Sequence, residues 1–158
     1  MTTVRRGEPR DHEACAAIYL AAAPLAFPWL PSDAIRREQL EAALREEELW
    51  VAEREGAIVG WLSFQDFYGR PAYGATAELS IYVSETAQRG GVGRHLLARA
   101  LEHAPALGLA TLLGFIFAHN TPSVTLFERH GFARWGHLPR VARLDGVERD
   151  LLILGRRL

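Results

Sequence analysis

The sequence contains no lysine and a single cysteine, Cys15, among its 158 residues. Without lysine, the protein cannot form a Schiff base with a substrate or use a lysine nucleophile. A single cysteine excludes an internal disulfide and a zinc site built from several cysteines. Because Cys15 lies in an alanine-rich helical pattern, we expect a small packing residue there rather than a nucleophile.

The sequence also lacks an excess of basic or of acidic residues, since its net charge is −1 at pH 7. This balance argues against a generic nucleic-acid or membrane-surface partner. A long hydrophobic run is lacking as well. Residues 14–30 carry no charge, but Pro24 and Pro28 interrupt them, and acidic residues precede them where a signal peptide has a basic region. We therefore expect one cytoplasmic domain over residues 1–158.

Hydrophobic periodicity predicts helices and strands along the whole chain. Strands are expected at residues 2–7, 49–53, 57–64, 75–84, 110–117, 132–144 and 147–154, and helices at 11–23, 33–48, 90–104 and 120–131. The order β-α-α-β-β-β-α-β-α-β-β predicts an α/β fold, with a mixed central sheet of about seven strands and helices on both faces.

Several boundaries are predicted by local residues. Asp11 is expected to cap the first helix, and Asn120 or Thr121 the last. Asp145 and Gly146 predict a two-residue turn in the closing hairpin. The buried face of the helix at 90–104 is expected at Leu97, Leu101 and Ala104.

The segment QRGGVGR, residues 88–94, places three glycines and two arginines between a predicted strand and a predicted helix. Helix N-termini bind anions through their N–H groups, and glycine lets an anion approach the backbone closely. A glycine-rich turn without a ligand is equally consistent with these residues alone. The segment is no Walker A loop, and Leu96 occupies the third glycine position of a dinucleotide fingerprint. The remaining pattern is Gln-x-x-Gly-x-Gly, at Gln88, Gly91 and Gly93.

The run ELSIYVSETAQRGGVGRHLLARAL, which contains this pattern, resembles the coenzyme-binding core of the GNAT superfamily of N-acetyltransferases. A second motif of that family is in register at Asn120, Ser123, Gly131 and Phe132. The predicted order of elements also matches the family fold. The resemblance thus covers essentially the whole chain.

The resemblance implies a set of acetyl-CoA contacts. The pyrophosphate would be held by Gln88, Arg89, Gly90, Gly91, Val92, Gly93 and Arg94. The backbone of Ile81, Tyr82 and Val83 would bind the pantetheine arm, and the Val83 N–H would polarise the thioester carbonyl. Asn120, Ser123 and Phe127 would lie at the coenzyme.

A narrower likeness concerns the acceptor. The run FYGRPAYGATAELSIYVS resembles the branch of phosphinothricin and methionine-sulfone acetyltransferases, which acetylate the α-amine of small amino-acid-like molecules. That likeness also implies a homodimer. The stretches expected to flank the acyl end contain Phe27, Trp29, Phe67, Arg70 and Tyr73. Arg70 is either a clamp for a substrate carboxylate or a solvated loop residue.

Glu78 is the candidate general base. Strand alternation places Glu78, Ser80 and Tyr82 on one face, although carboxylates are disfavoured in strands. A carboxylate there faces either a wet pocket or solvent at a sheet edge. The family resemblance favours the first interpretation, because Glu78 falls where that branch keeps its catalytic glutamate.

The proton donor for the leaving thiolate is less well defined. Many family members have a tyrosine where this chain has Phe127. Water, another group or unaided departure of the thiolate are the alternatives. His119, His130 and His137 are further candidates for proton handling. No cluster of histidine, cysteine and carboxylates has the spacing of a metal site, so we expect no metal.

Together these features predict an acetyl-CoA-dependent N-acetyltransferase that acts by direct attack in a ternary complex. The expected acceptor is a small primary amine, with amino-acid-like molecules first. Two alternatives stay open. One is a non-catalytic CoA-binding module with the same fold, and the other is an acetyltransferase for peptide N-termini or antibiotics.

Overall fold

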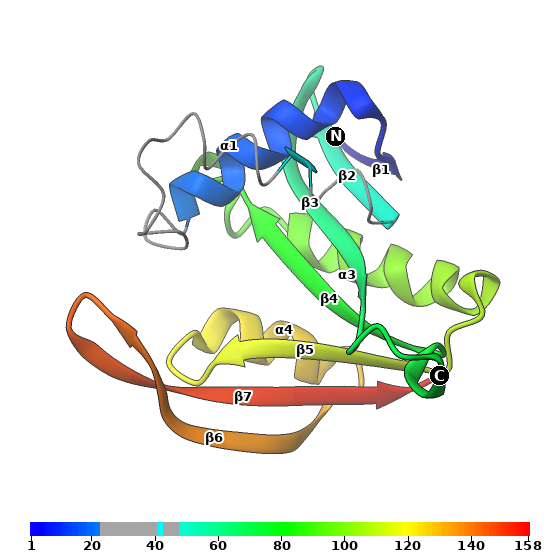
Figure 1. The fold of residues 1–158 in the computed structure, drawn as a ribbon. Coiled ribbons are helices and arrows are strands. Elements are labelled where there is room, and N and C mark those ends of the chain that lie inside the picture. The colour runs from blue at the N-terminus through cyan, green and yellow to red at the C-terminus, as the bar shows by residue number, and fades with distance from the viewer. Residues whose placement is uncertain (23–40, 43–47) are drawn as a thin grey trace. The chain divides into compact units, whose positions relative to one another are not determined.

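The helices and strands follow the predicted order in the computed structural model, which describes residues 1–22, 41–42 and 48–158 (Figure 1). They are β1 (Thr2–Arg6), α1 (His12–Ala22), β2 (Glu48–Arg54), β3 (Ala57–Asp66), β4 (Thr76–Val83), α3 (Val92–His103), β5 (Thr111–Phe117), α4 (Thr121–Arg129), β6 (Ala133–Leu144) and β7 (Val147–Arg157). The helix predicted at 33–48 lies almost entirely outside the described residues.

The strands form one seven-stranded sheet in the order β1-β2-β3-β4-β5-β7-β6. β4 and β5 run parallel, whereas β1/β2, β2/β3, β5/β7 and β6/β7 are antiparallel. This is the mixed α/β sheet that the sequence predicts. The chain divides into two compact units, Met1–Phe64 with Ile81–Arg99 and Gln65–Ser80 with Ala100–Leu158. β4 contributes to both.

In the first unit, helices cover both faces of β3. α1 packs through Cys15 and Ala16 against a cluster that includes Trp61. On the opposite side, a Cβ on Gly60 would lie 2.8 Å from a methyl group of Val92 in α3. Adjacent strand residues point to opposite faces, so α1 and α3 cover opposite sides of this strand.

The start of α1 differs from the prediction. A short 3₁₀ turn, Pro9–Asp11, precedes the helix, and the Asp11 carboxylate accepts hydrogen bonds from the Glu8 N–H and from the guanidinium of Arg5. Asp11 thus ties the turn to β1 instead of capping the first turn of α1. The Arg5 guanidinium and the Glu8 N–H both hold the pKa of Asp11 below its usual value, with Arg5 the larger cause.

The buried face of α3 includes two of the three predicted residues, Leu97 and Ala104, and adds two others. Leu96, Leu97, Ala100 and Ala104 are buried, while Leu101 is only half-buried. Leu96 faces Gly60, whose missing side chain lets the helix approach the sheet. No helix among the described residues is long and apolar enough to cross a membrane.

In the second unit, α4 packs on β5, and β6 and β7 form a long hairpin. A Cβ on Gly114 would lie 2.7 Å from the ring of Phe127, so only glycine permits this close approach of α4 to β5. Asp145 (φ 51°) and Gly146 (φ 77°) form the predicted hairpin turn. The β6 strand carries register shifts between Arg134 and Gly136 and between Leu138 and Ala142.

Candidate active site

The glycine-rich loop, residues 88–94, lies in the first unit between β4 and α3, as predicted. A 3₁₀ turn, Glu85–Ala87, leads into it, and α3 begins at Val92. Arg89 (φ 67°) and Gly91 (φ 80°) both adopt the left-handed conformation. The His95 N–H donates to the Gly91 carbonyl at 3.1 Å, which closes the first helical turn. The N–H groups before it have no acceptor inside the helix, so the loop ends in a site suited to an anion.

Two guanidinium groups lie beside this loop, and the exposed Arg89 of the loop carries a third. A Cβ on Gly90 would lie 3.0 Å from a terminal nitrogen of Arg54, and a Cβ on Gly91 would lie 3.5 Å from one of Arg94. Arg54 reaches the loop from the end of β2, where it donates to the Thr2 hydroxyl at 2.8 and 3.0 Å. Arg54, Arg89 and Arg94 form no ion pair with any described residue. Their positive charge is therefore available to a phosphate.

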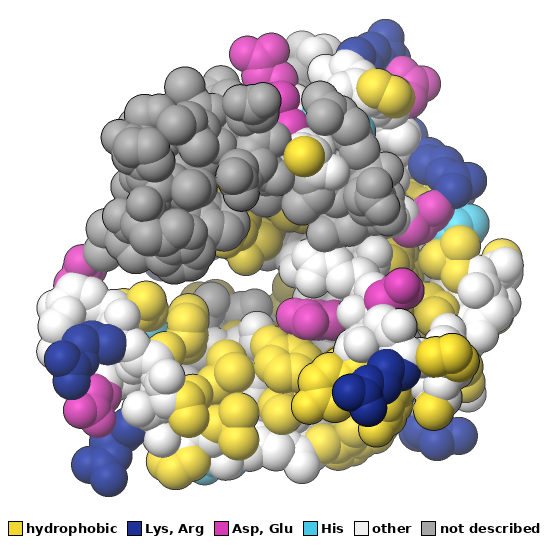
Figure 2. Space-filling view, in the orientation of Figure 1, with side chains coloured by type: hydrophobic (Ala, Val, Ile, Leu, Met, Phe, Trp, Pro, Cys, Tyr) yellow, Lys and Arg dark blue, Asp and Glu magenta, His cyan; other side chains and the backbone are white. Residues whose placement is uncertain are grey.

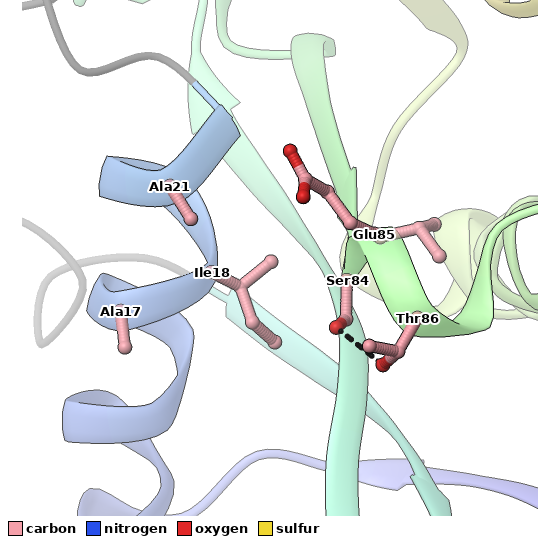
Figure 3. A pocket seen from close by; sticks show the side chains of 7 residues that line it. Ala17, Ile18, Ala21, Ser84, Glu85 and Thr86 are labelled. Carbon is pink, nitrogen blue, oxygen red and sulfur yellow. Dashed lines mark hydrogen bonds between the residues drawn. The ribbon is translucent and has the colours of Figure 1, made fainter.

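A cavity of about 320 Å³ lies beside the same segment of chain. It is lined by Ala17, Ile18 and Ala21 of α1 and by Val83, Ser84, Glu85 and Thr86. Figure 3 shows the hydroxyls of Ser84 and Thr86, 3.1 Å apart, turned toward each other, while the Glu85 side chain extends away from them. The cavity therefore has apolar walls and adjoins the residues that run directly into the loop.

Side chains of Ile81, Tyr82 and Val83 are half-buried in the first unit. The Tyr82 ring lies 5.0 Å from that of Trp61 and 4.8 Å from that of Tyr19. The side chain of Val92 is 1% exposed. Tyr82 and Val92 can therefore offer a ligand mainly their backbone groups.

Glu78 lies in the second unit. Its Cα partner across the parallel β4–β5 pair is Leu113. Ala77 and Leu79 are buried on the opposite face of β4, and Glu78 is half-buried. The alternation predicted for β4 is thus confirmed, and the carboxylate stands beside apolar residues of β5.

Aromatic side chains gather in the connection between β3 and β4. The Phe67 ring lies 5.1 Å from that of Tyr68, 5.5 Å from that of Tyr73 and 6.4 Å from that of Phe115. Arg70 is exposed and begins the 3₁₀ turn Pro71–Tyr73. Because β5 residues two apart share a face, Phe115 lies on the same face as Leu113 and Glu78. The Phe67 ring, which also contacts Tyr73 and lies three residues before Arg70, is therefore near a ring on the Glu78 face.

Asn120 caps α4, since its side-chain oxygen accepts from the Ser123 N–H at 3.4 Å. Phe127 is 2% exposed, and its ring packs on Phe132 at 4.9 Å and against Gly114. Phe127 is thus a packing residue of α4. Phe27 and Trp29 lie outside the described residues.

The remaining titratable candidates have other partners. A ring nitrogen of His130 lies 2.8 Å from the Leu126 carbonyl, and His137 lies 2.7 Å from Asp150. The His119 ring stacks on Phe117 at 5.8 Å. Burial raises the pKa of the Cys15 thiol to about 12, so this residue does not supply a thiolate nucleophile. The described part of the chain contains no group of three potential metal ligands.

The sequence matches a family model, "Acetyltransferase (GNAT) family", over residues 13–132, well over half of the chain. The chain belongs to the GNAT family of acetyltransferases. The expectation drawn from Gln88, Gly91 and Gly93 and from the Asn120 motif is thereby confirmed at the level of the family.

Individual relatives of this acetyltransferase give more detail. YwnH of Bacillus subtilis (strain 168), named "Putative phosphinothricin acetyltransferase", is 47% identical over 99% of this chain and 99% of its own. The L-methionine sulfoximine/L-methionine sulfone acetyltransferase of Salmonella typhimurium is 31% identical over 66% of this chain and 61% of its own. A crystal structure of the phosphinothricin acetyltransferase (Pat) from Sinorhizobium meliloti in complex with AcCoA is similar with a TM-score of 0.85 and 26% identity, over 99% of this chain and 88% of that one. The chain is thus related to phosphinothricin and amino-acid acetyltransferases.

Two residues of this acetyltransferase near the candidate site were not predicted. Arg54 reaches the glycine-rich loop from a different hairpin, and nothing in the local sequence marks it. Phe115 stands in an apolar run, and only the pairing of Glu78 with Leu113 shows which face it shares. A register prediction for the parallel pair would have found Phe115.

Proposed function

We propose that this acetyltransferase moves the acetyl group of acetyl-CoA to the primary amine of a small, amino-acid-like molecule. The observation that carries the proposal is the glycine-rich loop. Its turn at Gly91 leads into the N-terminus of α3, beside the guanidinium groups of Arg54 and Arg94, which form no ion pair with a described residue. The pyrophosphate of acetyl-CoA is the anion that such a loop would hold.

The coenzyme contacts follow from this placement. Gln88, Gly90, Gly93 and Arg94 would bind phosphate oxygens through backbone and side-chain donors. Ile81 and Val83, together with Tyr82, would bind the pantetheine arm through backbone groups, and the Val83 N–H would polarise the thioester carbonyl. The cavity beside Val83 and Ser84 gives room for part of that arm. Asn120 and Ser123 would add contacts from the start of α4. Residues 1–158 would act as a single N-acetyltransferase domain.

Glu78 would act as the general base. Acetyl-CoA supplies an activated acyl group, and the acceptor amine must lose a proton before it can attack. Glu78 would take that proton directly or through one water, which leaves a neutral amine to attack in a ternary complex. The C–N bond would form as the C–S bond breaks, and the nitrogen would then lose its second proton to water. The departing thiolate has a pKa of about 8.5 and would take a proton from water, since Phe127 has no hydroxyl to give one.

Acceptor binding is assigned to Arg70 and the rings beside it. The exposed Arg70 would hold the acceptor carboxylate in bidentate fashion, with Phe67 and Tyr73 as the wall next to it. Phe27 and Trp29 stay predictions from sequence, as do a homodimer, a cytoplasmic location and the absence of a metal.

The test is release of free CoA thiol from acetyl-CoA in the presence of a panel of amines. Amino acids, their decarboxylated analogues, a peptide with a free N-terminus and an aminoglycoside cover the alternatives. We expect turnover with amino acids and little with the others. Binding of acetyl-CoA without turnover of any amine would support the non-catalytic module, and neither binding nor turnover would remove the proposal.

A further inference from the structure

His95 lies one helical turn after Gly91, near the start of α3. Residues four apart share a face of a helix, and their side chains lean back toward its N-terminus. The His95 ring therefore reaches back over the glycine-rich loop. A Cβ on Gly91 would lie 3.8 and 3.9 Å from the Cε1 and Nδ1 atoms of His95, and 3.5 Å from a terminal nitrogen of Arg94. An imidazole and a guanidinium thus approach the same point above Gly91.

The His95 side chain has no other task among the described residues. It is exposed, and its ring forms no hydrogen bond or ion pair with any of them. The nearest acids along the chain are Glu85, before the loop, and Glu102, two turns further along α3. A phosphate bound above Gly91 would therefore meet a ring nitrogen that is free to donate a hydrogen bond.

The two units differ in the side chains that they expose. Figure 2 shows hydrophobic side chains gathered over β5 and β7 of the second unit, whereas cations gather at the start of α3 in the first. Arg54 reaches the loop from β2, Arg89 and Arg94 belong to the loop, and Arg99 follows His95 by one turn of α3. An anion bound among these arginines would favour a proton on the imidazole, because opposite charges within about 4–6 Å stabilise the charged form. The protonation of His95 should therefore depend on whether a phosphate is bound.

We propose that His95 binds the pyrophosphate of acetyl-CoA as the imidazolium, so that the protein takes up a proton from solvent when the coenzyme binds. The inference rests on the proposed function and adds a pH response to its coenzyme site. The proton joins the free nitrogen of the neutral imidazole, and no covalent bond of acetyl-CoA changes. An arginine keeps its charge at every pH, whereas an ordinary histidine changes its charge between about pH 5 and 8. A histidine beside Arg94 thus makes the coenzyme affinity depend on pH.

This role concerns a different step from that of Glu78. A ligand that prefers the protonated form of His95 binds most tightly at low pH, and the gain is lost as the ring deprotonates. The Kd for acetyl-CoA should therefore rise with pH, whereas a general base at Glu78 acts on the chemical step. CoA carries the same pyrophosphate, so the product should also be held more tightly at low pH.

Isothermal titration calorimetry measures the proton directly. Acetyl-CoA is titrated at one pH in PIPES and in Bis-Tris, whose ionisation enthalpies differ, and the difference in observed enthalpy gives the protons taken up. Acetyl-dephospho-CoA is titrated as well, because a phosphomonoester such as the 3′-phosphate of CoA has a second pKa of about 6 and binds protons of its own. We expect proton uptake with both coenzymes and a Kd that rises by about 5-fold or more between about pH 6 and 8. Uptake that disappears with bound acetyl-dephospho-CoA would assign the proton to the 3′-phosphate and overturn the proposal.

Variants assign the proton to one residue. His95→Gln keeps a hydrogen-bonding side chain that cannot become cationic, and should lose both the proton uptake and the rise in Kd. His95→Arg fixes the charge and should keep the low-pH affinity at every pH without proton uptake. Because His95 is exposed, neither substitution should change the Tm of the free protein. His137→Gln is the matched control and should titrate like the wild type, since His137 is an exposed histidine of β6 that lies 2.7 Å from Asp150.

The outcomes separate this inference from the proposed function. Equal proton uptake in the wild type and in His95→Gln would overturn the role of His95 and leave acetyl-CoA as the coenzyme. A rise in Kd that persists in His95→Arg would do the same. If acetyl-CoA gives the wild type neither a heat of binding nor a shift in melting temperature, the proposed function itself fails, and this inference fails with it.

Discussion

Glu78 occupies a half-buried strand position, where a carboxylate is disfavoured. Its Cα partner on β5 is the buried Leu113, and its neighbours in β4 are the buried Ala77 and Leu79. Burying part of a carboxylate costs free energy, and the proposed role as a general base would account for keeping one at this position. A general base next to an apolar wall would meet the acceptor amine as that amine leaves water.

Glu78→Gln preserves the shape of the side chain and removes the base. We expect kcat/KM at neutral pH to fall by about 10²–10⁴-fold, with the affinity for acetyl-CoA unchanged. The loss should shrink as pH rises toward the pKa of the acceptor amine, because the neutral amine then forms without help. Steady-state kinetics across pH measure this.

The control for Glu78→Gln is the same substitution at Glu55, an exposed residue of the turn between β2 and β3. Glu55→Gln should behave as the wild type. Near-wild-type turnover of the Glu78 variant at neutral pH would remove this residue from the mechanism. Loss of stability with no rescue at high pH would indicate a structural role instead.

At the scale of elements, the glycine-rich loop depends on one backbone conformation. Gly91 has a φ of 80°, which a β-branched side chain adopts only with strain, and a side chain there would also occupy the phosphate path. Gly91→Val should therefore abolish most acetyl-CoA binding. Gly56 has the same φ of 80° and open space around it. Gly56→Val is therefore a control that introduces the same backbone strain without placing a side chain in the glycine-rich loop.

Titration calorimetry with acetyl-CoA separates the two glycine variants. Gly56→Val should lose stability and keep its coenzyme affinity. If both variants bind acetyl-CoA like the wild type, the loop does not hold the pyrophosphate.

The 3₁₀ turn before α1 gives the stability a defined pH dependence. Arg5 holds the folded pKa of Asp11 below its ordinary value of 3.8. A depressed carboxylate pKa stabilises the fold above the unfolded value, and this contribution is lost as pH falls through the folded value. Asp11→Asn should thus cost about 2 kcal/mol at neutral pH.

Thermal unfolding of wild type and Asp11→Asn at several pH values tests this. The difference in Tm should be constant above about pH 5 and should shrink below about pH 4. Asp66→Asn, at an exposed residue of β3, should match the wild type throughout. A difference in Tm that does not change with pH would assign the effect to packing and not to charge.

The elements that sequence predicts well are those whose geometry is set within a few residues. The turn at Asp145 and Gly146 and the cap at Asn120 each follow from local backbone preference. The role of Asp11 was wrong because its partner Arg5 comes from the neighbouring strand. Leu97 and Ala104 of the predicted buried face of α3 are buried, whereas Leu101 was wrong; the burial of Leu96 was missed because its neighbour Gly60 lies on a distant strand.

At the scale of the whole molecule, family membership could be predicted from sequence, and the composition of the face around Glu78 could not. Gln88, Gly91 and Gly93 form one continuous motif, and together with the Asn120 motif and the order of elements it indicates the family. The face around Glu78 combines residues of β4 and β5, and Phe115 joins it only through strand register. Such pairings connect residues far apart in the chain, where periodicity carries no information about alignment.

The coenzyme should stabilise the entire fold. A ligand that binds only the folded state adds about 2.7 kcal/mol at 100 times its dissociation constant. For a chain of this size, that raises Tm by roughly 5–11 °C. The wild type should show this rise with acetyl-CoA, and Gly91→Val should not, because its loop no longer admits the pyrophosphate. Differential scanning calorimetry at increasing acetyl-CoA concentration measures both, and the rise should grow with the logarithm of concentration. A wild-type Tm that stays constant at saturating acetyl-CoA would contradict the assignment of acetyl-CoA as the coenzyme. By mass action, any ligand that binds only the folded state must shift the unfolding equilibrium.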